Sequence, residues 1–494
     1  MHQPTFDQFN ALSQQGNSIP VSRVIMADLE TPVTAFMKLA HNDPHAFMLE
    51  SVEHGEKLGR FSFIGFSPSH RFISRGDTLT EYHDGNETTH TVKRGEDPLH
   101  HLEQFTKRFQ PAPVENMPPF YGGLVGFLGY EMIQFFEKLD FNNEDAMATP
   151  DSVFFFADTV IAFDHFDRTI RVISNAYIDG DVQAAYDEAV KRIDEVVEKL
   201  KAPLPQTSFG AGRDDNPVFR SNVEPDAFKQ SVEQAKEYIR AGDVCQVVIG
   251  IRNQMDFKST PLDLYRALRR VNPSPYTFFF RCDDMCLVGG SPEILVKLED
   301  ERVTYRPIAG TRRRGKTPEE DLFFEKELIN DPKEQAEHIM LVDLGRNDIG
   351  RVCKFHTVEV TDLMYVERYS HVMHLVSNVE GVMQDGCNGF DVMRAVFPAG
   401  TVTGAPKVRA MQIIEELETT KRGPYAGALG YFGLSGDMDF CITLRTIVTV
   451  GATAYVQAGA GIVADSEPEL EYKECMNKSR AMLRAIELAE SSKE

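Results

Sequence analysis

Tryptophan is absent from this 494-residue sequence, and so is any long apolar run. No hydrophobic stretch approaches 18 residues, which predicts that no segment spans a membrane. The N-terminal residues MHQPTFDQFNALSQQGNS lack a basic segment followed by an apolar core, so we expect no secretory signal. These absences predict a protein of the cytoplasm.

Cysteine is scarce, and basic residues are outnumbered. The seven cysteines are scattered without a C-x-x-C pair, which predicts free thiols and excludes a disulfide framework or a zinc site. Lys and Arg total 52 against 75 Asp and Glu, a formal net charge of −23. Such a surface repels nucleic acid and anionic lipid, so neither is an expected partner. An anionic substrate therefore needs a local site, and the arginines of 312–314 are one candidate, although a solvated or partner-facing loop is the simpler interpretation.

The chain is long enough for two or three domains. Residues 201–220 are rich in Pro, Gly, Ser and Asp and predict a linker between an N-terminal region, 1–200, and a C-terminal region, 221–494. Helical spacing recurs in 181–200, 226–242 and 469–490, and helix-start signals occur at Thr317 and Asp331. Strand-like runs outnumber these helices without a βαβα alternation, which predicts an α+β fold with mainly antiparallel sheets.

Several residues could carry chemistry. Glu337 shares a predicted helical face with apolar neighbours, where a carboxylate needs a partner or a metal ion, although a pair with Arg346 or a partly exposed edge would also explain it. Glu471 and Glu474 lie near the start of the last helix, a common position for acids. If that helix faced Glu337, the carboxylates would suit Mg²⁺. His374 is a possible proton-handling group, although a buried core histidine is the simpler interpretation.

Two glycine-rich segments follow strand-like runs, at 397–407 and 457–469. We expect both to be turns, whose backbone N–H groups could bind a carboxylate or phosphate. Neither has the spacing of a P-loop.

Eight motifs, taken in order, carry a family resemblance. They closely resemble the chorismate-utilising enzymes, and among these the large subunits of anthranilate synthases. The resemblance is dense from about 224 to 484 and thinner before that. The motifs are AGDVCQVV, NPSPY, SPE, PIAGTRRRG, EHIMLVDLGRNDIGRV, FPAGTVTGAPKVRAM, GPYAGALGY and GAGIVADSEPELEYKECMNK.

The resemblance implies a fold of large antiparallel sheets packed as a sandwich with helices outside. It implies a reaction in which ammonia adds to chorismate, the ring hydroxyl leaves, and pyruvate is eliminated to give anthranilate. Glu293 of the SPE motif would be the acid for the hydroxyl group. Glu337 and Glu474 would bind Mg²⁺, with Glu471 close behind.

Other roles also follow from the resemblance. His374 matches the histidine linked to pyruvate elimination, and Thr401 a further active-site hydroxyl. Arg445, in the strand-like run CITLRT, would hold the enolpyruvyl carboxylate with Tyr425. The remaining residues implied to contact chorismate are Gly310, Thr311, Gly459, Ala460 and Gly461.

Ala309 and Gln246 indicate which nucleophile reacts. Related aminodeoxychorismate synthases have a lysine nucleophile at the position of Ala309, and isochorismate-type relatives have a lysine base at that of Gln246. Alanine leaves room for free ammonia, and glutamine cannot deprotonate water. We therefore expect ammonia rather than lysine or water to attack the ring.

The resemblance also implies a partner and an inhibitor. Ammonia would come from a glutamine amidotransferase subunit, component II, because the sequence contains no glutaminase half; this implies a hetero-oligomer, either a heterodimer or a dimer of such pairs. The N-terminal region would be regulatory and feedback-inhibited by tryptophan, and a sequence without tryptophan would suit synthesis during tryptophan starvation. Thr277 stands where the family often has methionine, which puts sensitivity to the inhibitor in question. The implied inhibitor contacts are Glu50, Ser51, Pro275, Tyr276 and Thr277.

Two alternatives stand beside this hypothesis. The chain could be the large subunit of an aminodeoxychorismate synthase or a related enzyme that stops before elimination, or it could be a non-catalytic sensor of tryptophan or chorismate. Ala309 argues against the first, His374 against early termination, and the full set of acidic residues against the sensor.

Overall fold

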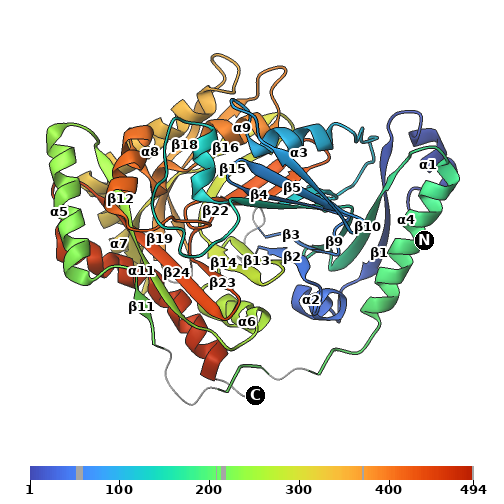
Figure 1. Cartoon of the computed structure of the whole chain (residues 1–494), viewed down its shortest axis with the longest axis horizontal. Coiled ribbons are helices and arrows are strands. Elements are labelled where there is room, and N and C mark those ends of the chain that lie inside the picture. The colour runs from blue at the N-terminus through green and yellow to red at the C-terminus, as the bar shows by residue number, and fades with distance from the viewer. Residues whose placement is uncertain (52–58, 207–208, 213–217, 370–371, 492–494) are drawn as a thin grey trace.

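The structure is a computed structural model that describes residues 1–51, 59–206, 209–212, 218–369 and 372–491. Two large sheets dominate it (Figure 1). Every ladder between the named strands is antiparallel, so the predicted α+β class with antiparallel sheets is confirmed.

The first sheet joins strands from both ends of the chain. In spatial order it contains β1 (Ser18–Met26), β10 (Thr169–Tyr177), β9 (Thr159–Asp164), β3 (Phe61–Phe66), β2 (His45–Glu50), β13 (Tyr276–Cys282), β14 (Met285–Ser291), β23 (Thr446–Val450), β24 (Thr453–Ile462), β12 (Gln246–Asp256) and β11 (Arg220–Ser221), and the short β20 (Gly404–Ala405) pairs with β12.

The second sheet also combines strands from the N-terminal and C-terminal parts of the chain. In spatial order it contains β17 (Ile308–Arg313), β19 (Val372–Val382), β16 (Arg302–Tyr305), β15 (Ile294–Glu299), β22 (Met438–Ile442), β21 (Ala428–Gly433), β7 (Gly123–Leu128), β8 (Ser152–Ala157), β4 (His70–Arg75), β5 (Thr78–His83) and β6 (Asn86–Thr91), and β18 (Glu359–Arg368) pairs with β19.

Helices cover the outer faces of the two sheets (Figure 1). Against the first sheet pack α2 (Pro32–Ala40), α4 (Val182–Leu200), α5 (Pro225–Ala241), α6 (Pro261–Val271), α10 (Lys407–Leu417) and α11 (Pro468–Ser491). Against the second pack α3 (Pro98–Thr106), α8 (Pro332–Gly350) and α9 (Gly389–Val396). The remaining helical segments are α1 (Phe6–Leu12), α7 (Pro318–Asn330) and the 3₁₀ turns η1 (Tyr130–Phe135) and η2 (Gly400–Val402).

The hydrophobic core lies in three layers. The inner layer fills the space between the two sheets with aromatic residues, among them Phe127, Phe155 and Phe280. The outer layers lie between each sheet and its helices. Burying two faces of each sheet explains why so many strands are apolar throughout, as in β7 and β8.

The division into residues 1–200 and 221–494 does not coincide with a division of the sheets. Each sheet continues from N-terminal strands into C-terminal strands, at the β2–β13 ladder in the first and the β7–β21 ladder in the second. The described residues of 201–219 contain no helix or strand, and this segment runs past the C-terminal end of α11 (Figure 1). The backbone N–H of Ala211 donates to the carbonyl of Ala489, 3.1 Å away.

Most predicted helices are confirmed. Gly242 closes α5 in the left-handed conformation, with φ of 84°, and Thr317 and Asp331 cap α7 and α8. The prediction of a turn at 457–469 was wrong for its first half, because β24 continues to Ile462 and pairs with β12. Among the described residues, no helix is long and apolar enough to cross a bilayer.

Candidate active site

Glu293 is the predicted acid, and it lies in the short connection between β14 and β15. Its carbonyl accepts the N–H of Ile442 at 3.1 Å, and its own N–H donates to the Ser291 hydroxyl at 3.3 Å. Its backbone is therefore held by β22 and β14. Only 7% of the residue is exposed. Burial raises the pKa of its carboxyl group to about 8, although Thr401, the N–H of Ile308 and the charge of Lys478 each lower it. The group therefore retains its proton at neutral pH.

His374 lies on β19, opposite Thr311 of β17. Its Nδ1 is 2.9 Å from the carbonyl oxygen of Gly310 and 3.1 Å from the Thr311 hydroxyl. A carbonyl oxygen only accepts, so Nδ1 carries the proton and Nε2 is left as a base. Burial lowers the pKa of His374, which favours this neutral form. A bulge with Gly310 at φ of 61° brings these groups together.

Glu337 on α8 faces α11, the arrangement that a shared metal site requires. The amide of Gln246 donates to its Oε1 at 2.9 Å. Burial raises the pKa of Glu337, and the nearby carboxylates of Glu334 and Glu474 raise it further. Arg346, a possible partner on sequence grounds, instead pairs with Asp343 at 2.9 Å. Glu337 thus has no ion pair among the described residues.

Glu474 and Glu471 lie on α11, the helix that approaches Glu337. Glu474 pairs with Lys478 at 2.6 Å. Glu471 is buried, and burial raises its pKa, with a further increase from the charge of Glu474. Glu474 thus raises the pKa of both Glu337 and Glu471, and the charges of Lys478 and, at Glu471, Lys333 oppose this effect. Carboxylates gathered in this way suit a hard divalent cation.

The implied carboxylate-binding residues also meet at this place. A Cβ added to Gly459 would lie 2.8 Å from the Tyr425 hydroxyl, and one added to Gly461 would lie 2.6 Å from Nε2 of Gln246. The two glycines of β24 therefore face Tyr425 and Gln246, and any side chain would fill the space between them. The side chain of Ala460 points to the opposite face, into the core under α5 and α10.

Arg445 lies outside the strands, contrary to the expectation from CITLRT. It immediately precedes β23 and has φ of 49°. Its Nη1 donates to the carbonyl of Lys478 at 2.7 Å, which ties it to α11. Burial lowers its pKa, and the nearby Tyr425 and Glu474 oppose this effect. Its guanidinium is thus placed by a helix contact rather than by a sheet.

Ala309 occupies β17 opposite Leu375 and is 9% exposed. Its preceding residue, Ile308, is the backbone donor to Glu293. Ala309 is therefore next in the chain to the residue that interacts with the acid.

The arginines of 312–314 are already paired. Arg312 contacts Glu327, Asp331 and Glu334 on α7 and α8. Arg313 pairs with Glu320, and Arg314 with Asp321. These pairs fasten the end of β17 to α7 and α8 rather than leaving the arginines free for an anion.

Lys478 was missed in the sequence. Its Nζ donates to the carbonyl of Gly459 at 2.9 Å and pairs with Glu474. Its charge also lowers the pKa of both Glu293 and Glu337. Its spacing of four residues from Glu474 could have indicated the ion pair but not its link to β24.

The predicted inhibitor contacts meet where β2 pairs with β13, with Glu50 opposite Thr277. Arg269 binds the Glu50 carboxylate through Nε at 2.8 Å and Nη2 at 2.9 Å, and the Tyr265 hydroxyl donates to the same group. The Ser51 hydroxyl is buried and makes no hydrogen bond within the described residues.

Tyr276 and Thr277 point to opposite sides of the first sheet. The Tyr276 hydroxyl donates to Asp439 at 2.9 Å, across the sandwich, and Thr277 donates to the carbonyl of Ser274 at 3.2 Å. Pro275 immediately precedes Tyr276, in the bend before β13.

Comparison with known proteins agrees with this geometry. The family described as chorismate binding enzyme matches residues 44–484. The chain belongs to this family.

Within the family, the sequences of two relatives align with nearly the whole length of this chain. The chain is 45% identical to anthranilate synthase component 1 of Acetivibrio thermocellus over 495 residues, which cover 99% of each chain. It is 45% identical to the Aquifex aeolicus protein of that name, with the same coverage. The crystal structure of anthranilate synthase component I from Streptococcus pneumoniae is 37% identical, with a TM-score of 0.77 over 93% of this chain and 99% of that one.

A more distant likeness supports the fold alone. The menaquinone-specific isochorismate synthase MenF of Escherichia coli is 19% identical, with a TM-score of 0.71 over 97% of this chain and 98% of that one.

Proposed function

We propose that this chain is the aminating subunit of an anthranilate synthase, which converts chorismate and ammonia to anthranilate and pyruvate. The observation that carries the proposal is the buried Glu293, protonated at neutral pH and placed near further carboxylates and near two glycines of β24 that face Tyr425 and Gln246. The relatives named anthranilate synthase component 1 support it independently.

Glu293 supplies the proton that the departing hydroxyl group needs. Hydroxide is a poor leaving group, so protonation lowers the barrier to its loss. A glutamic acid with a pKa of about 8 holds its proton at pH 7 and gives it up readily once charge develops on the oxygen.

His374 takes part in the second half of the reaction. Loss of pyruvate and aromatisation require removal of a proton from the ring. Because Nδ1 is held by the carbonyl of Gly310, the free Nε2 can accept that proton.

Glu337 and Glu474 would hold Mg²⁺, with Glu471 supporting them. The donor set fits the ion, because Glu337 is a buried carboxylate with no cation of its own among the described residues. When bound, the ion supplies positive charge to neutralise the ring carboxylate. Gln246 orients Glu337 through its amide, and Lys478 partly offsets the mutual repulsion of the acids.

Tyr425, Arg445 and the backbone of 459–461 would bind the enolpyruvyl carboxylate. The hydroxyl and guanidinium groups donate hydrogen bonds, and Gly459 and Gly461 leave space for the ligand to approach the strand. Gly310 and Thr311 would contact the ring side, next to His374.

The chain selects ammonia through residues that cannot react. Ala309 offers no amine beside Glu293, and Gln246 cannot act as a base toward water. Ammonia would come from a glutamine amidotransferase subunit in a hetero-oligomer. Tryptophan would inhibit through the β2–β13 site, where the Ser51 hydroxyl offers an uncommitted hydrogen-bonding group.

An activity assay tests the proposal. The purified chain is given chorismate, Mg²⁺ and high ammonium at alkaline pH, and anthranilate is followed by its fluorescence, with and without tryptophan. Anthranilate formation supports the reaction, and its suppression by tryptophan supports the inhibitor site. Chorismate consumed without anthranilate, or 4-amino-4-deoxychorismate as the product, would contradict the proposed function and the role of Ala309.

A further inference from the structure

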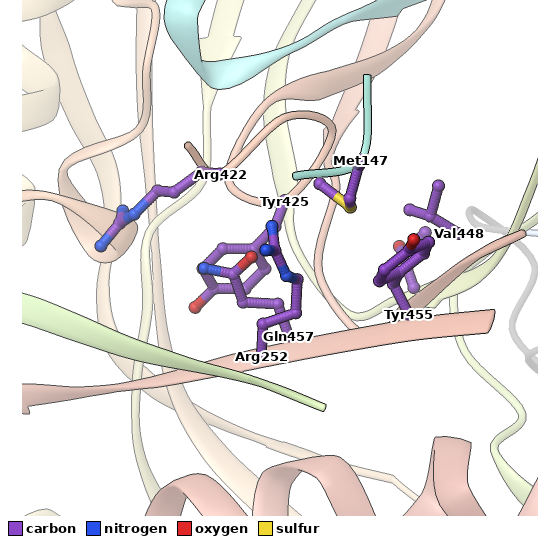
Figure 2. Close-up of a pocket in the computed structure, with 8 residues that line it drawn as sticks. Met147, Arg252, Arg422, Tyr425, Val448, Tyr455 and Gln457 are labelled. Atoms are coloured by element: carbon purple, nitrogen blue, oxygen red, sulfur yellow. The ribbon is translucent and has the colours of Figure 1, made fainter. Parts of the chain in front are cut away.

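A small pocket is bordered by Tyr425 and by residues of β12, β23 and β24. Figure 2 shows Arg252 of β12 and Gln457 of β24 side by side, with Tyr425 close to them and Met147, Val448 and Tyr455 to one side. The space open to the centre of a water-sized sphere is about 10 Å³. That suits a single occupant of atomic size.

Arg252 brings a full charge into this pocket. It is only 2% exposed, and the one side-chain hydrogen bond it makes within the described residues runs from Nη1 to the carbonyl of Lys421, 3.1 Å away. Its Nε is buried without a hydrogen bond, its guanidinium carbon lies 5.7 Å from the centre of the Tyr455 ring, and no described carboxylate forms an ion pair with it. A buried charge in this condition is costly, so a neutralising partner is required.

Arg422, which lines the same pocket, shows how this chain treats a buried arginine when its partners are its own. It is 1% exposed, and its Nε and Nη2 bind Glu418 at 2.9 and 2.5 Å. Its Nη1 donates to the carbonyl of Val402, and Nη2 donates also to that of Val248, each at 2.8 Å. Arg422 is fully satisfied by protein groups, whereas Arg252 is not.

The other acids near Arg252 are already committed. Glu418 binds Arg422 and also accepts the N–H of Gly250 at 2.8 Å. Glu131 accepts the backbone N–H groups of Arg422 and Gly423 at 2.7 and 3.0 Å, so both of its oxygens are hydrogen-bonded. Both act on Arg252 only at longer range, as does Asp145.

Gln457 adds a second uncommitted polar group. It is 7% exposed, and its Oε1 is buried without a hydrogen bond among the described residues. Oxygen and nitrogen of an amide exchange places by rotation, so the NH₂ group can turn toward the pocket and donate there.

We propose that the pocket binds one halide-sized anion, chloride under ordinary conditions, through Arg252 with Gln457 as a second donor. The ion neutralises the guanidinium, fills a space of its own size and joins β12 to β24 below Tyr425. Water could satisfy the N–H of Arg252 but would leave its charge unbalanced. The site is independent of the proposed reaction, because none of its donors belongs to the catalytic set.

The test uses the wild-type chain and its stability. We expect the midpoint of thermal unfolding to rise by roughly 2–4 °C, saturably, when chloride replaces gluconate at constant ionic strength. Bromide should act in the same way, and a crystal soaked in bromide should show an anomalous peak within hydrogen-bonding distance of Nε of Arg252. A chloride-independent midpoint together with no such peak would overturn the proposal.

A matched pair of variants gives a further check. Arg252→Met should lose the chloride dependence while keeping its stability in gluconate, because it removes the unpaired charge along with the ion. Arg302→Met is the control, since Arg302 is an exposed arginine of the second sheet and should keep the dependence. If Arg252→Met fails to fold, the bromide peak and the chloride dependence of the wild-type unfolding midpoint still test the proposal. Stabilisation by acetate or formate but not by halides would contradict a halide-sized site.

Discussion

Glu293 and Glu50 are both buried glutamates at strand ends, Glu50 at the end of β2 and Glu293 in the connection after β14, yet their surroundings are opposite. Glu50 is 5% exposed and bound by two nitrogens of Arg269 and by the Tyr265 hydroxyl. Glu293 is 7% exposed and has only a hydroxyl, one backbone N–H and a more distant lysine. The first is an anchor between β2 and α6, and the second is an acid whose proton is available.

The difference shows how one fold supports two kinds of site. Burial raises the pKa of Glu50 as well, but Arg269 and the Tyr265 hydroxyl oppose this rise and fix the carboxylate in one position, which suits a structural role. A carboxylate buried without such a partner titrates near neutral pH, which suits proton transfer. The following predictions test this contrast, beginning with the largest effect.

Replacing the acid should have the largest effect. Glu293→Gln cannot donate the proton, and we expect kcat for anthranilate formation to fall about 10²–10⁴-fold. The circular dichroism spectrum should not change, because the amide has the same shape. Glu299→Gln is the control, since Glu299 ends β15 with an exposed side chain. An activity loss of less than tenfold in Glu293→Gln would contradict its role.

Replacing Glu337 should weaken the binding of Mg²⁺. Glu337→Gln removes one charge from the site, and we expect the Mg²⁺ concentration for half-maximal activity to rise at least tenfold. Mg²⁺ binding measured by calorimetry without substrate should weaken in parallel. Asp343→Asn is the control on the exposed face of α8. Normal Mg²⁺ binding in Glu337→Gln would exclude it as a ligand.

Replacing Glu50 should lower the stability of the protein rather than its activity. Glu50→Gln leaves Arg269 without its counter-charge, and we expect a loss of about 3 kcal/mol in the free energy of unfolding. Urea denaturation measures it, and the kcat of the folded variant should stay near the wild-type value. A large fall in kcat without a loss of stability would place Glu50 in the reaction and end the contrast with Glu293.

The smallest change in catalysis is expected at Ser51. Its hydroxyl is buried without a hydrogen bond among the described residues, so Ser51→Phe should fill the inhibitor site. Tryptophan inhibition should then weaken at least tenfold while uninhibited activity remains. Ser51→Ala is the milder comparison, and unchanged inhibition in Ser51→Phe would place the regulatory site elsewhere.

The sequence indicated candidate site residues but not how they are held. The ordered motifs named Glu293, Glu337 and Glu474, and the antiparallel α+β class followed from strand patterns. The glycine-rich 457–469 was mistaken for a turn because glycine weakens strand patterns, although here it makes room for Tyr425 and Gln246.

The rest depended on contacts between distant segments. Nothing in the spacing of Lys478 shows that it reaches Gly459, and nothing around Arg445 shows that its position depends on α11. The sharing of both sheets by N-terminal and C-terminal strands is equally invisible locally, because pairing partners such as β2 and β13 lie more than 200 residues apart.

The pH dependence of kcat tests the central claim most directly. Because burial raises the pKa of Glu293, the reactive form is the protonated one, present below a pH of about 8 and lost above it. With free ammonia held constant and saturating at each pH, kcat should fall with a slope of one proton above that value. A kcat that stays level to pH 9.5, or rises, would contradict a protonated Glu293 as the acid of this reaction.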